Sequence, residues 1–110
     1  MRVATTRVLV LATWLASGAM VAAAAAQPPT HTVTIEGMQY NPAALMVHRG
    51  ERVVWLNKDL FPHTVTAVDK TFDSQGIAAN ASWSYVATRN GEYAYGCRFH
   101  PTMKGRLTVQ

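Results

Sequence analysis

The chain has 110 residues and a net charge of +4 at neutral pH, from ten Lys and Arg against six Asp and Glu. This length leaves room for one hydrophobic core, and the weak positive balance gives no reason to expect a nucleic-acid partner. Cys97 is the only cysteine, which excludes a disulfide within the chain.

Residues 1–26 have the organisation of a secretory signal peptide. Arg2 and Arg7 supply positive charge, the stretch from Val8 to Met20 is mostly apolar, and the segment ends in Ala24-Ala25-Ala26. A membrane anchor is the alternative, but the strongly apolar core is short for a membrane span. We therefore expect cleavage after residue 26, export to the periplasm, and no stable membrane insertion of the remaining protein.

The expected mature protein is a single domain of residues 27–110. Without Arg2 and Arg7 its net charge falls from +4 to +2. A domain of this size buries a modest share of its surface, so a metal would add useful stability. A free thiol is also vulnerable to oxidation in an exported protein. Metal coordination by Cys97 would both stabilise the small domain and protect the thiol from oxidation.

Short segments in which polar and apolar residues alternate dominate this domain and predict β-strands. Asn90-Gly91 has the sequence of a hairpin turn, and the irregular stretch Thr71–Ala81 has room for one short helix. Seven to eight short strands with turns between them indicate an all-β, antiparallel sandwich. In chain order, the expected strands cover residues 32–35, 44–47, 52–56, 63–68, 82–86, 92–97 and 105–109.

Four residues form a candidate metal site. Cys97, His100 and Met103 lie in one run with the spacing C-x-x-H-x-x-M, and His63 lies far upstream. One thiolate, two imidazoles and one thioether suit copper, because two His and one Cys with a weak axial Met form a blue-copper electron-transfer site. Zinc is a poorer match, since a thioether is a poor zinc ligand.

Each of these residues taken alone has a more ordinary interpretation. A single Cys or Met usually packs in a core, and a single His is usually structural or solvated. The joint spacing and the placement at strand ends favour a shared metal site. His31 and His48 lie near the N-terminus and before a turn, and we expect both to be solvated.

The strand expected before Cys97 explains how the thiol reaches such a site. Alternation places Tyr93, Tyr95 and Cys97 on one face, and if that face looks inward Cys97 lies at the edge of the core. Gly96 permits a close backbone approach beside it. His63 would approach the same point from the end of a different strand.

At these residues the chain resembles the cupredoxin family, in particular its small plastocyanin-like and amicyanin-like members. The resemblance covers nearly all of residues 31–110, and the short gap between His100 and Met103 is similar to that of amicyanins. It implies a Greek-key sandwich that holds one copper through His63, Cys97 and His100, with Met103 as the axial ligand. The matching segments are Val47–Trp55, Pro62–Val65, Gly91–Cys97 and Met103–Val109.

The resemblance also implies a function. It predicts a monomeric carrier that shuttles single electrons between larger redox proteins, such as a c-type cytochrome or a periplasmic dehydrogenase or oxidase. A copper carrier or buffer without an electron partner is the alternative, because the ligands alone do not separate the two. An enzyme with Cys97 as nucleophile and His100 as base lacks an evident third, orienting group. We therefore expect no catalytic activity.

Two positions depart from the family pattern. Phe99 stands before the second histidine, where amicyanins and plastocyanins usually carry Pro, and Thr64 follows the first histidine, where they often carry Asn. The backbone N–H of Thr64 can still reach the Cys97 sulfur, but any side-chain brace across the site must differ. Arg98 adds a charge beside the expected electron port. Because such outer contacts tune a metal site, the resemblance leaves potential and partner open.

Overall fold

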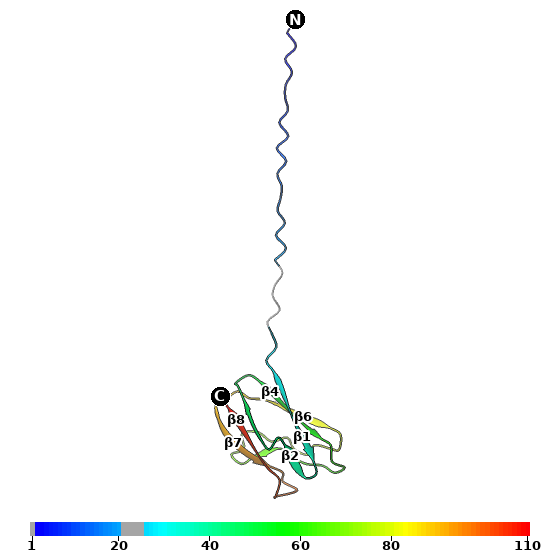
Figure 1. Cartoon of the computed structure of the whole chain (residues 1–110), viewed down its shortest axis with the longest axis vertical. Helices are drawn as coiled ribbons and strands as arrows, with labels where there is room; N and C mark the ends of the chain where they lie inside the picture. The colour runs from blue at the N-terminus through cyan, green and yellow to red at the C-terminus, as the bar shows by residue number, and fades with distance from the viewer. Residues whose placement is uncertain (1, 21–25) are drawn as a thin grey trace.

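The structure, a computed structural model, describes residues 2–20 and 26–110. The C-terminal part forms a β-sandwich, and residues 2–20 run away from it as an extended trace (Figure 1). No helix long and apolar enough to cross a membrane occurs in the described parts of the chain. Ala24 and Ala25, in the small-residue end of the expected signal peptide, lie outside the described residues.

Two four-stranded sheets make up the sandwich. The described strands are β1 (Thr30–Glu36), β2 (Gln39–Asn41), β3 (Ala44–Val47), β4 (Arg52–Asn57), β5 (Thr66–Ala67), β6 (Ser82–Val86), β7 (Gly91–Gly96) and β8 (Lys104–Val109). One sheet has the strand order β2-β1-β4-β6, and the other has the order β3-β8-β7-β5. The expected all-β sandwich of seven to eight strands is confirmed.

Both sheets are mixed. β1 pairs in parallel with β4 and β3 pairs in parallel with β8, whereas the other pairs are antiparallel. The expected antiparallel pairing therefore holds for four of these pairs, and the two parallel pairs are an addition that the sequence analysis did not foresee. The chain leaves the first sheet after β2, builds β3 in the second sheet, and returns with β4 beside β1. A crossover of this kind brings two strands together in the same direction.

The stretch Thr71–Ala81, where the sequence left room for one short helix, contains none. Left-handed backbone at Gln75 (φ 57°) and Asn80 (φ 62°) interrupts any helical run. An isolated bridge between Asp73 and Thr66 instead ties this loop to β5. The loop is thus held by backbone pairing and lies alongside the second sheet.

The turn signal at Asn90-Gly91 is also misleading. The strands on either side of it, β6 and β7, belong to different sheets, so the chain crosses the sandwich here and forms no hairpin. The hydroxyl of Tyr93 donates to the carbonyl of Arg89 at 2.8 Å and fastens the crossing. The local sequence is compatible with a tight turn, but β6 pairs with β4 and β7 pairs with β8, so the two strands belong to different sheets.

Two strands differ in extent from the sequence-based expectation. The strand predicted over residues 63–68 is reduced to β5, and His63 makes only an isolated bridge with Ile77. The three-residue β2 was not expected, because alternation cannot be recognised over so short a run. It matters nonetheless, since it carries the buried Tyr40 into the core.

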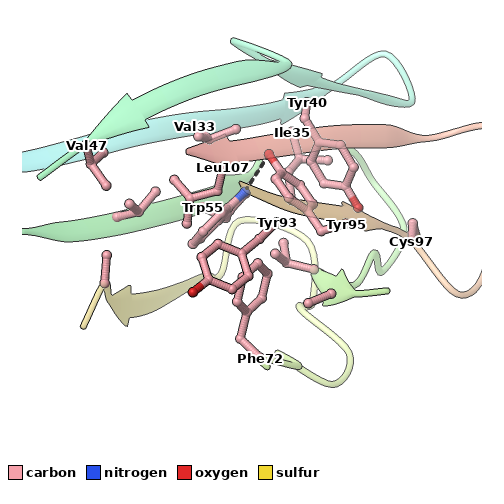
Figure 2. Packing of buried hydrophobic residues seen from close by; sticks show 14 of the residues in the cluster. Val33, Ile35, Tyr40, Val47, Trp55, Phe72, Tyr93, Tyr95, Cys97 and Leu107 are labelled. Atoms are coloured by element: carbon pink, nitrogen blue, oxygen red, sulfur yellow. Dashed lines mark hydrogen bonds between the residues drawn. The ribbon is translucent and has the colours of Figure 1, made fainter. Parts of the chain in front are cut away.

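Aromatic side chains fill the space between the sheets (Figure 2). Trp55 of β4 is fully buried, and its indole N–H donates to the hydroxyl of Tyr95 in β7 at 3.2 Å. The Tyr95 ring also packs edge-on against Tyr40, with ring centroids 4.8 Å apart. Tyr93, Tyr95 and Cys97 are all buried, so the expected inward face of β7 is confirmed. The two sheets are thus joined by packing and by a hydrogen bond close behind Cys97.

We expect Gly105→Ala to lower the free energy of unfolding by about 1–3 kcal/mol, the usual cost of overpacking. A methyl group at this position of β8 would overlap the ring of Tyr95, which Trp55 and Tyr40 hold in place. Urea unfolding of protein without added metal measures the effect. Gly76→Ala is the matched control, because a methyl group there meets nothing within 4 Å. Equal losses in both variants would contradict the packing argument.

Candidate metal centre

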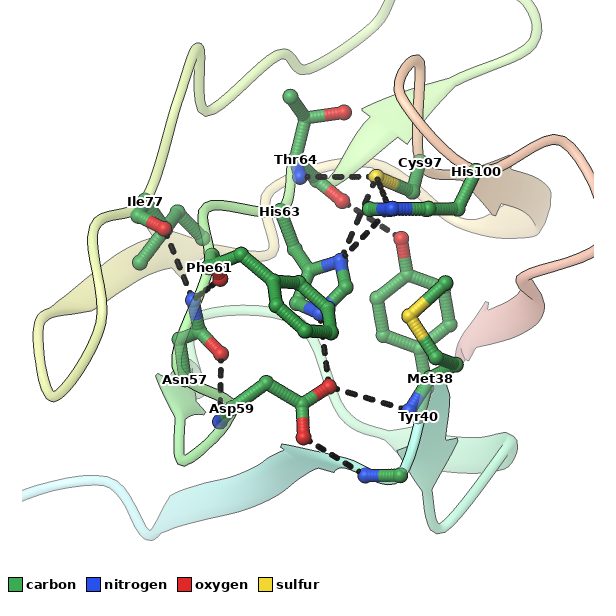
Figure 3. A network of polar contacts seen from close by, with 11 residues as sticks. Met38, Tyr40, Asn57, Asp59, Phe61, His63, Thr64, Ile77, Cys97 and His100 are labelled. Atoms are coloured by element: carbon green, nitrogen blue, oxygen red, sulfur yellow. Dashed lines mark hydrogen bonds and ion pairs between the residues drawn. The ribbon is translucent and has the colours of Figure 1, made fainter.

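The structure brings His63, Cys97 and His100 together at one end of the sandwich (Figure 3). The Nδ1 atoms of the two histidines are 3.1 Å apart, and Cys97 Sγ lies 3.8 Å from His63 Nδ1 and 3.7 Å from His100 Nδ1. Donor atoms that each bind one ion at about 2.0–2.3 Å lie roughly 3 to 4 Å from one another. The triangle therefore has the size of a three-ligand metal site.

The loop between β7 and β8 supplies most of the candidate ligands. Cys97 follows the last residue of β7, and Met103 directly precedes β8. The backbone N–H of Met103 donates to the carbonyl of His100 at 3.0 Å, which turns the loop back on itself. A methyl group on Gly96 would lie 2.8 Å from the Met103 carbonyl oxygen, so only glycine allows this close approach. Met103 is buried, and its role as an axial ligand stays a prediction.

The two histidines differ in their exposure to solvent. His63 is fully buried, whereas His100 is partly exposed. The ring of Phe61 packs against both, with centroid separations of 5.3 Å to His63 and 5.6 Å to His100. Phe61 itself is 45% exposed and Phe99 is 54% exposed. The His100 side of the site is therefore open to solvent and surrounded by aromatic side chains.

A carboxylate fixes the orientation of His63. Its Nε2 lies 2.7 Å from Asp59 Oδ2, and because an ionised carboxylate only accepts hydrogen bonds, Nε2 carries the proton. In the neutral ring Nδ1 is then the nitrogen with the free lone pair, and it faces Cys97 and His100 as a metal ligand must. This is the carboxylate–histidine arrangement that commonly supports metal sites.

Asp59 is itself held by backbone groups. The N–H of Gly37 donates to Oδ1 at 2.8 Å and the N–H of Met38 donates to Oδ2 at 3.0 Å. Burial opposes ionisation of this carboxyl, but the hydrogen bonds from Met38, His63 and Gly37 outweigh it and hold the pKa of Asp59 below its ordinary value. Sequence reasoning missed Asp59, although an acidic residue four positions before a candidate ligand is a signal that could have found it.

Thr64 anchors the site from the other side. Its backbone N–H donates to Cys97 Sγ at 3.3 Å, so the predicted contact is confirmed. The Tyr40 hydroxyl donates to the Thr64 carbonyl at 2.5 Å, and burial, with a smaller contribution from Cys97, raises the pKa of Tyr40. The phenol therefore stays protonated and fixes the residue whose N–H contacts the Cys97 sulfur.

The remaining histidines lie away from the metal centre. His31 is partly buried and its Nε2 lies 3.1 Å from Glu51 Oε1, so the expectation that it is solvated is wrong. Glu51 also accepts the backbone N–H of His48 at 2.6 Å. His48 is exposed, as expected. Because Arg52 begins β4 and Asn57 ends it, Glu51 and Asp59 mark opposite ends of the sandwich.

Comparison with known proteins identifies the family. A family model for the cupredoxin-like domain matches residues 7–109. Amicyanin-alpha of Methylorubrum extorquens is 30% identical over 101 residues, which cover 87% of this chain and 85% of the relative. The chain therefore belongs to the cupredoxin-like family.

Two solved structures place the fold more narrowly. A variant of amicyanin in its Cu(I) form is 28% identical with a TM-score of 0.69, over 74% of this chain and 82% of that chain. A copper-containing nitrite reductase from Thermus scotoductus SA-01 has a TM-score of 0.73 at 28% identity, over 82% of this chain but 24% of the enzyme. The likeness to the enzyme thus extends over one part of a longer chain, whereas the likeness to amicyanin covers most of both proteins.

We expect Asp59→Asn to lower the free energy of unfolding of the metal-free protein by about 1 kcal/mol, the usual net contribution of one hydrogen bond. An Asn side chain has only one acceptor oxygen. Its NH2 group would therefore face a backbone N–H that now donates to Asp59, and two donors would be opposed. Urea unfolding measures the loss. Glu36→Gln removes the same charge at an exposed strand end and serves as the control. Equal stability of the two variants would contradict the bracing role.

Proposed function

We propose that this protein is a blue-copper electron carrier in which His63, Cys97 and His100 bind one copper ion and Met103 is the weak axial ligand. The observation that carries the proposal is the triangle of two Nδ1 atoms and one Sγ, 3.1 to 3.8 Å apart, in a cupredoxin-like sandwich. The donor set fits copper better than zinc because it includes a thioether. Copper held there supplies one-electron chemistry by alternating between Cu(I) and Cu(II).

The residues of the chain contribute rigidity. Asp59 fixes the ring of His63, and the Thr64 N–H fixes the sulfur of Cys97. Both contacts lie inside a packed region, so the ligands keep nearly one arrangement whichever charge the site carries. Small rearrangement for each electron transferred favours fast transfer, and this is the physical case for an electron carrier over a storage protein.

The exposed edge of His100 is the proposed electron port. Phe61 packs against the His100 ring and Phe99 precedes it, and both phenylalanines are about half exposed. Leu60, 89% exposed, extends the same apolar region along the chain. An exposed apolar patch around one ligand suits brief docking with a larger redox protein. A c-type cytochrome and a periplasmic dehydrogenase or oxidase are the partner classes that we propose.

We further propose that residues 1–26 are a signal peptide and that residues 27–110 act in the periplasm as a monomeric carrier. The charged start and the apolar run of the leader support export. The single thiol supports a metal-bound state in an oxidising compartment. A carrier of this kind has no catalytic activity of its own.

A copper carrier or buffer is the second candidate. The partly exposed His100 favours it to some degree, because a ligand at the surface gives a path for copper to leave. The two functions differ in one measurable respect: an electron carrier retains its copper through repeated oxidation and reduction, whereas a copper carrier passes it to an acceptor. Redox cycling in the presence of a Cu(I) chelator separates them.

Protein loaded with Cu(II) should show an intense visible absorption band from Cys97 thiolate-to-copper charge transfer. The band should bleach on reduction, return on oxidation, and survive many cycles with a chelator present. Cys97→Ala should abolish it, whereas Met46→Leu, at an exposed position in β3, should leave it unchanged. A Cys97→Ala protein that keeps the band would disprove ligation by this thiol.

Substitution of Met103 should change the reduction potential more than it changes copper retention, because an axial thioether binds weakly. Met103→Leu should raise the potential, since Cu(II) loses more stabilisation than Cu(I) does when the thioether is removed. Met103→Gln should lower it, since an amide oxygen favours Cu(II). Potentiometric titration followed at the visible band measures both. Identical potentials in all three proteins would remove Met103 from the site.

A further inference from the structure

Next to Cys97, four residues form a closed ring of hydrogen bonds that begins beside the candidate metal centre. They are Arg98, Thr64, Thr66 and Asp73. The backbone N–H of Arg98 donates to Thr64 Oγ1 at 2.9 Å, and Thr64 Oγ1 lies 2.9 Å from Thr66 Oγ1. Thr66 Oγ1 donates to Asp73 Oδ1 at 3.2 Å. The guanidinium of Arg98 donates to Asp73 Oδ2 and completes the ring.

The direction of each proton in this ring is determined. Ionised Asp73 only accepts hydrogen bonds, so Thr66 must donate to it. The Thr66 oxygen then accepts from the Thr64 hydroxyl, and the Thr64 oxygen is left to accept from the Arg98 N–H. All donors therefore point along one path toward the carboxylate. Such a chain polarises each hydroxyl in turn, which makes Thr64 Oγ1, the acceptor farthest from Asp73, a stronger acceptor for the Arg98 N–H.

The acidic end of the path is held firmly. The N–H of Gln75 donates to Asp73 Oδ1 at 3.0 Å, and an isolated backbone bridge joins Asp73 to Thr66. The next residue, Ser74, exchanges two hydrogen bonds with Val65, of 2.9 Å and 2.7 Å. Asp73 is thus fixed to β5 by backbone pairing, and its position does not depend on the ion pair with Arg98 alone.

The other end of the path touches the metal ligand. Thr64, only 1% exposed, donates its backbone N–H to Cys97 Sγ and receives the next backbone N–H, that of Arg98, on its side chain. The position of Thr64 relative to the Cys97–Arg98 peptide therefore depends on the hydroxyl. If the hydroxyl contact is lost, the N–H of Arg98 has no partner and the sulfur contact loosens.

We propose that Thr64, Thr66 and Asp73, here called the hydroxyl relay, position the Cys97 thiolate and thereby set the reduction potential of the site. The relay takes the place of the single Asn side chain that resembled proteins often carry after the first histidine. The inference rests on the proposed copper function. The proposal also gives Arg98 a structural role, because its guanidinium donates a hydrogen bond to Asp73 and so completes the ring that contains the hydroxyl relay.

The relay has a predictable electronic effect. A hydrogen bond to a thiolate withdraws electron density from sulfur, which favours the reduced, less positive metal. Loosening the Thr64 N–H contact should therefore lower the potential. In protein without copper, the same loosening should leave the Cys97 thiol more reactive, because its contact with Thr64 no longer limits its motion.

Neutral substitutions test the relay without changing any charge. Thr64→Val should lower the potential and shift the thiolate-to-copper band, Thr66→Val should do the same to a smaller extent, and the corresponding Ser variants should restore both. Thr108→Val, in β8, is the matched control and should change neither. In copper-free protein, Thr64→Val should speed modification of Cys97 by a thiol reagent about fivefold, the factor expected for one lost hydrogen bond.

A second pair of variants separates the effect of the relay from the effect of removing one positive charge. Arg98 and Arg106 are similarly exposed, and each pairs with a carboxylate, Asp73 and Glu92 respectively. Arg98→Gln should shift the band and lower the potential, whereas Arg106→Gln should leave the band in place. Equal changes in these two variants would mean that only charge matters and would overturn the relay.

The outcomes distinguish the relay from the function on which it rests. If wild-type protein has no charge-transfer band, the copper proposal itself fails. If wild type shows the band but Thr64→Val and Thr66→Val keep the wild-type potential and band, the relay fails while the copper site stands. Should Thr64→Val not fold, Thr66→Val still decides, because the Thr66 side chain lies at the partly exposed surface.

Discussion

The metal centre depends on keeping three electron-rich atoms close together. The Nδ1 atoms of His63 and His100 and the Sγ atom of Cys97 lie 3.1 to 3.8 Å from one another, and lone pairs directed at one point at these distances repel. Such an arrangement persists only if the surrounding structure imposes it. The sandwich does so with segments far apart in the sequence, since His63 and Cys97 are separated by 34 residues.

Each of the three candidate ligands is held by a different kind of contact. His63 has the partly buried carboxylate of Asp59 on its Nε2, Cys97 has a backbone N–H on its sulfur, and His100 is held by the turn that its carbonyl makes with Met103. The core extends these restraints inward. Tyr95 lies two residues before Cys97, hydrogen-bonds to Trp55, and packs on Tyr40, which in turn binds the Thr64 carbonyl. The packing of the core and the geometry of the site are therefore one continuous structure.

The sequence predicts the residues that meet at the candidate site better than it predicts the residues that support them. The spacing of Cys97, His100 and Met103 is local, and alternation along one strand is enough to send Tyr95 and Cys97 inward. Asp59 could not be assigned in the same way, because its contact with His63 depends on how the intervening loop turns. In that loop the Asn57 side chain donates to the Phe61 carbonyl and accepts the Asp59 N–H.

The same limit explains the errors in the fold. Parallel pairing of β1 with β4 and the sheet crossing at Asn90-Gly91 are properties of the whole topology, and no local pattern encodes them. Thr71–Ala81 has no period of either kind because its order comes from backbone pairing and from side chains such as Asp73. Irregular sequence there indicates a loop shaped by tertiary contacts, which a propensity argument cannot describe.

The departures from the family pattern act on different sides of the site. Thr64 is shorter than Asn, and its hydroxyl reaches outward through Thr66 to a charged residue on a separate loop. Phe99 replaces a rigid Pro on the opposite side and adds exposed apolar surface beside His100. One change therefore alters how the thiolate is held, and the other alters the surface through which a partner would approach. Because these regions share only the candidate ligands, the proposed function predicts that reduction potential and partner preference can be changed independently.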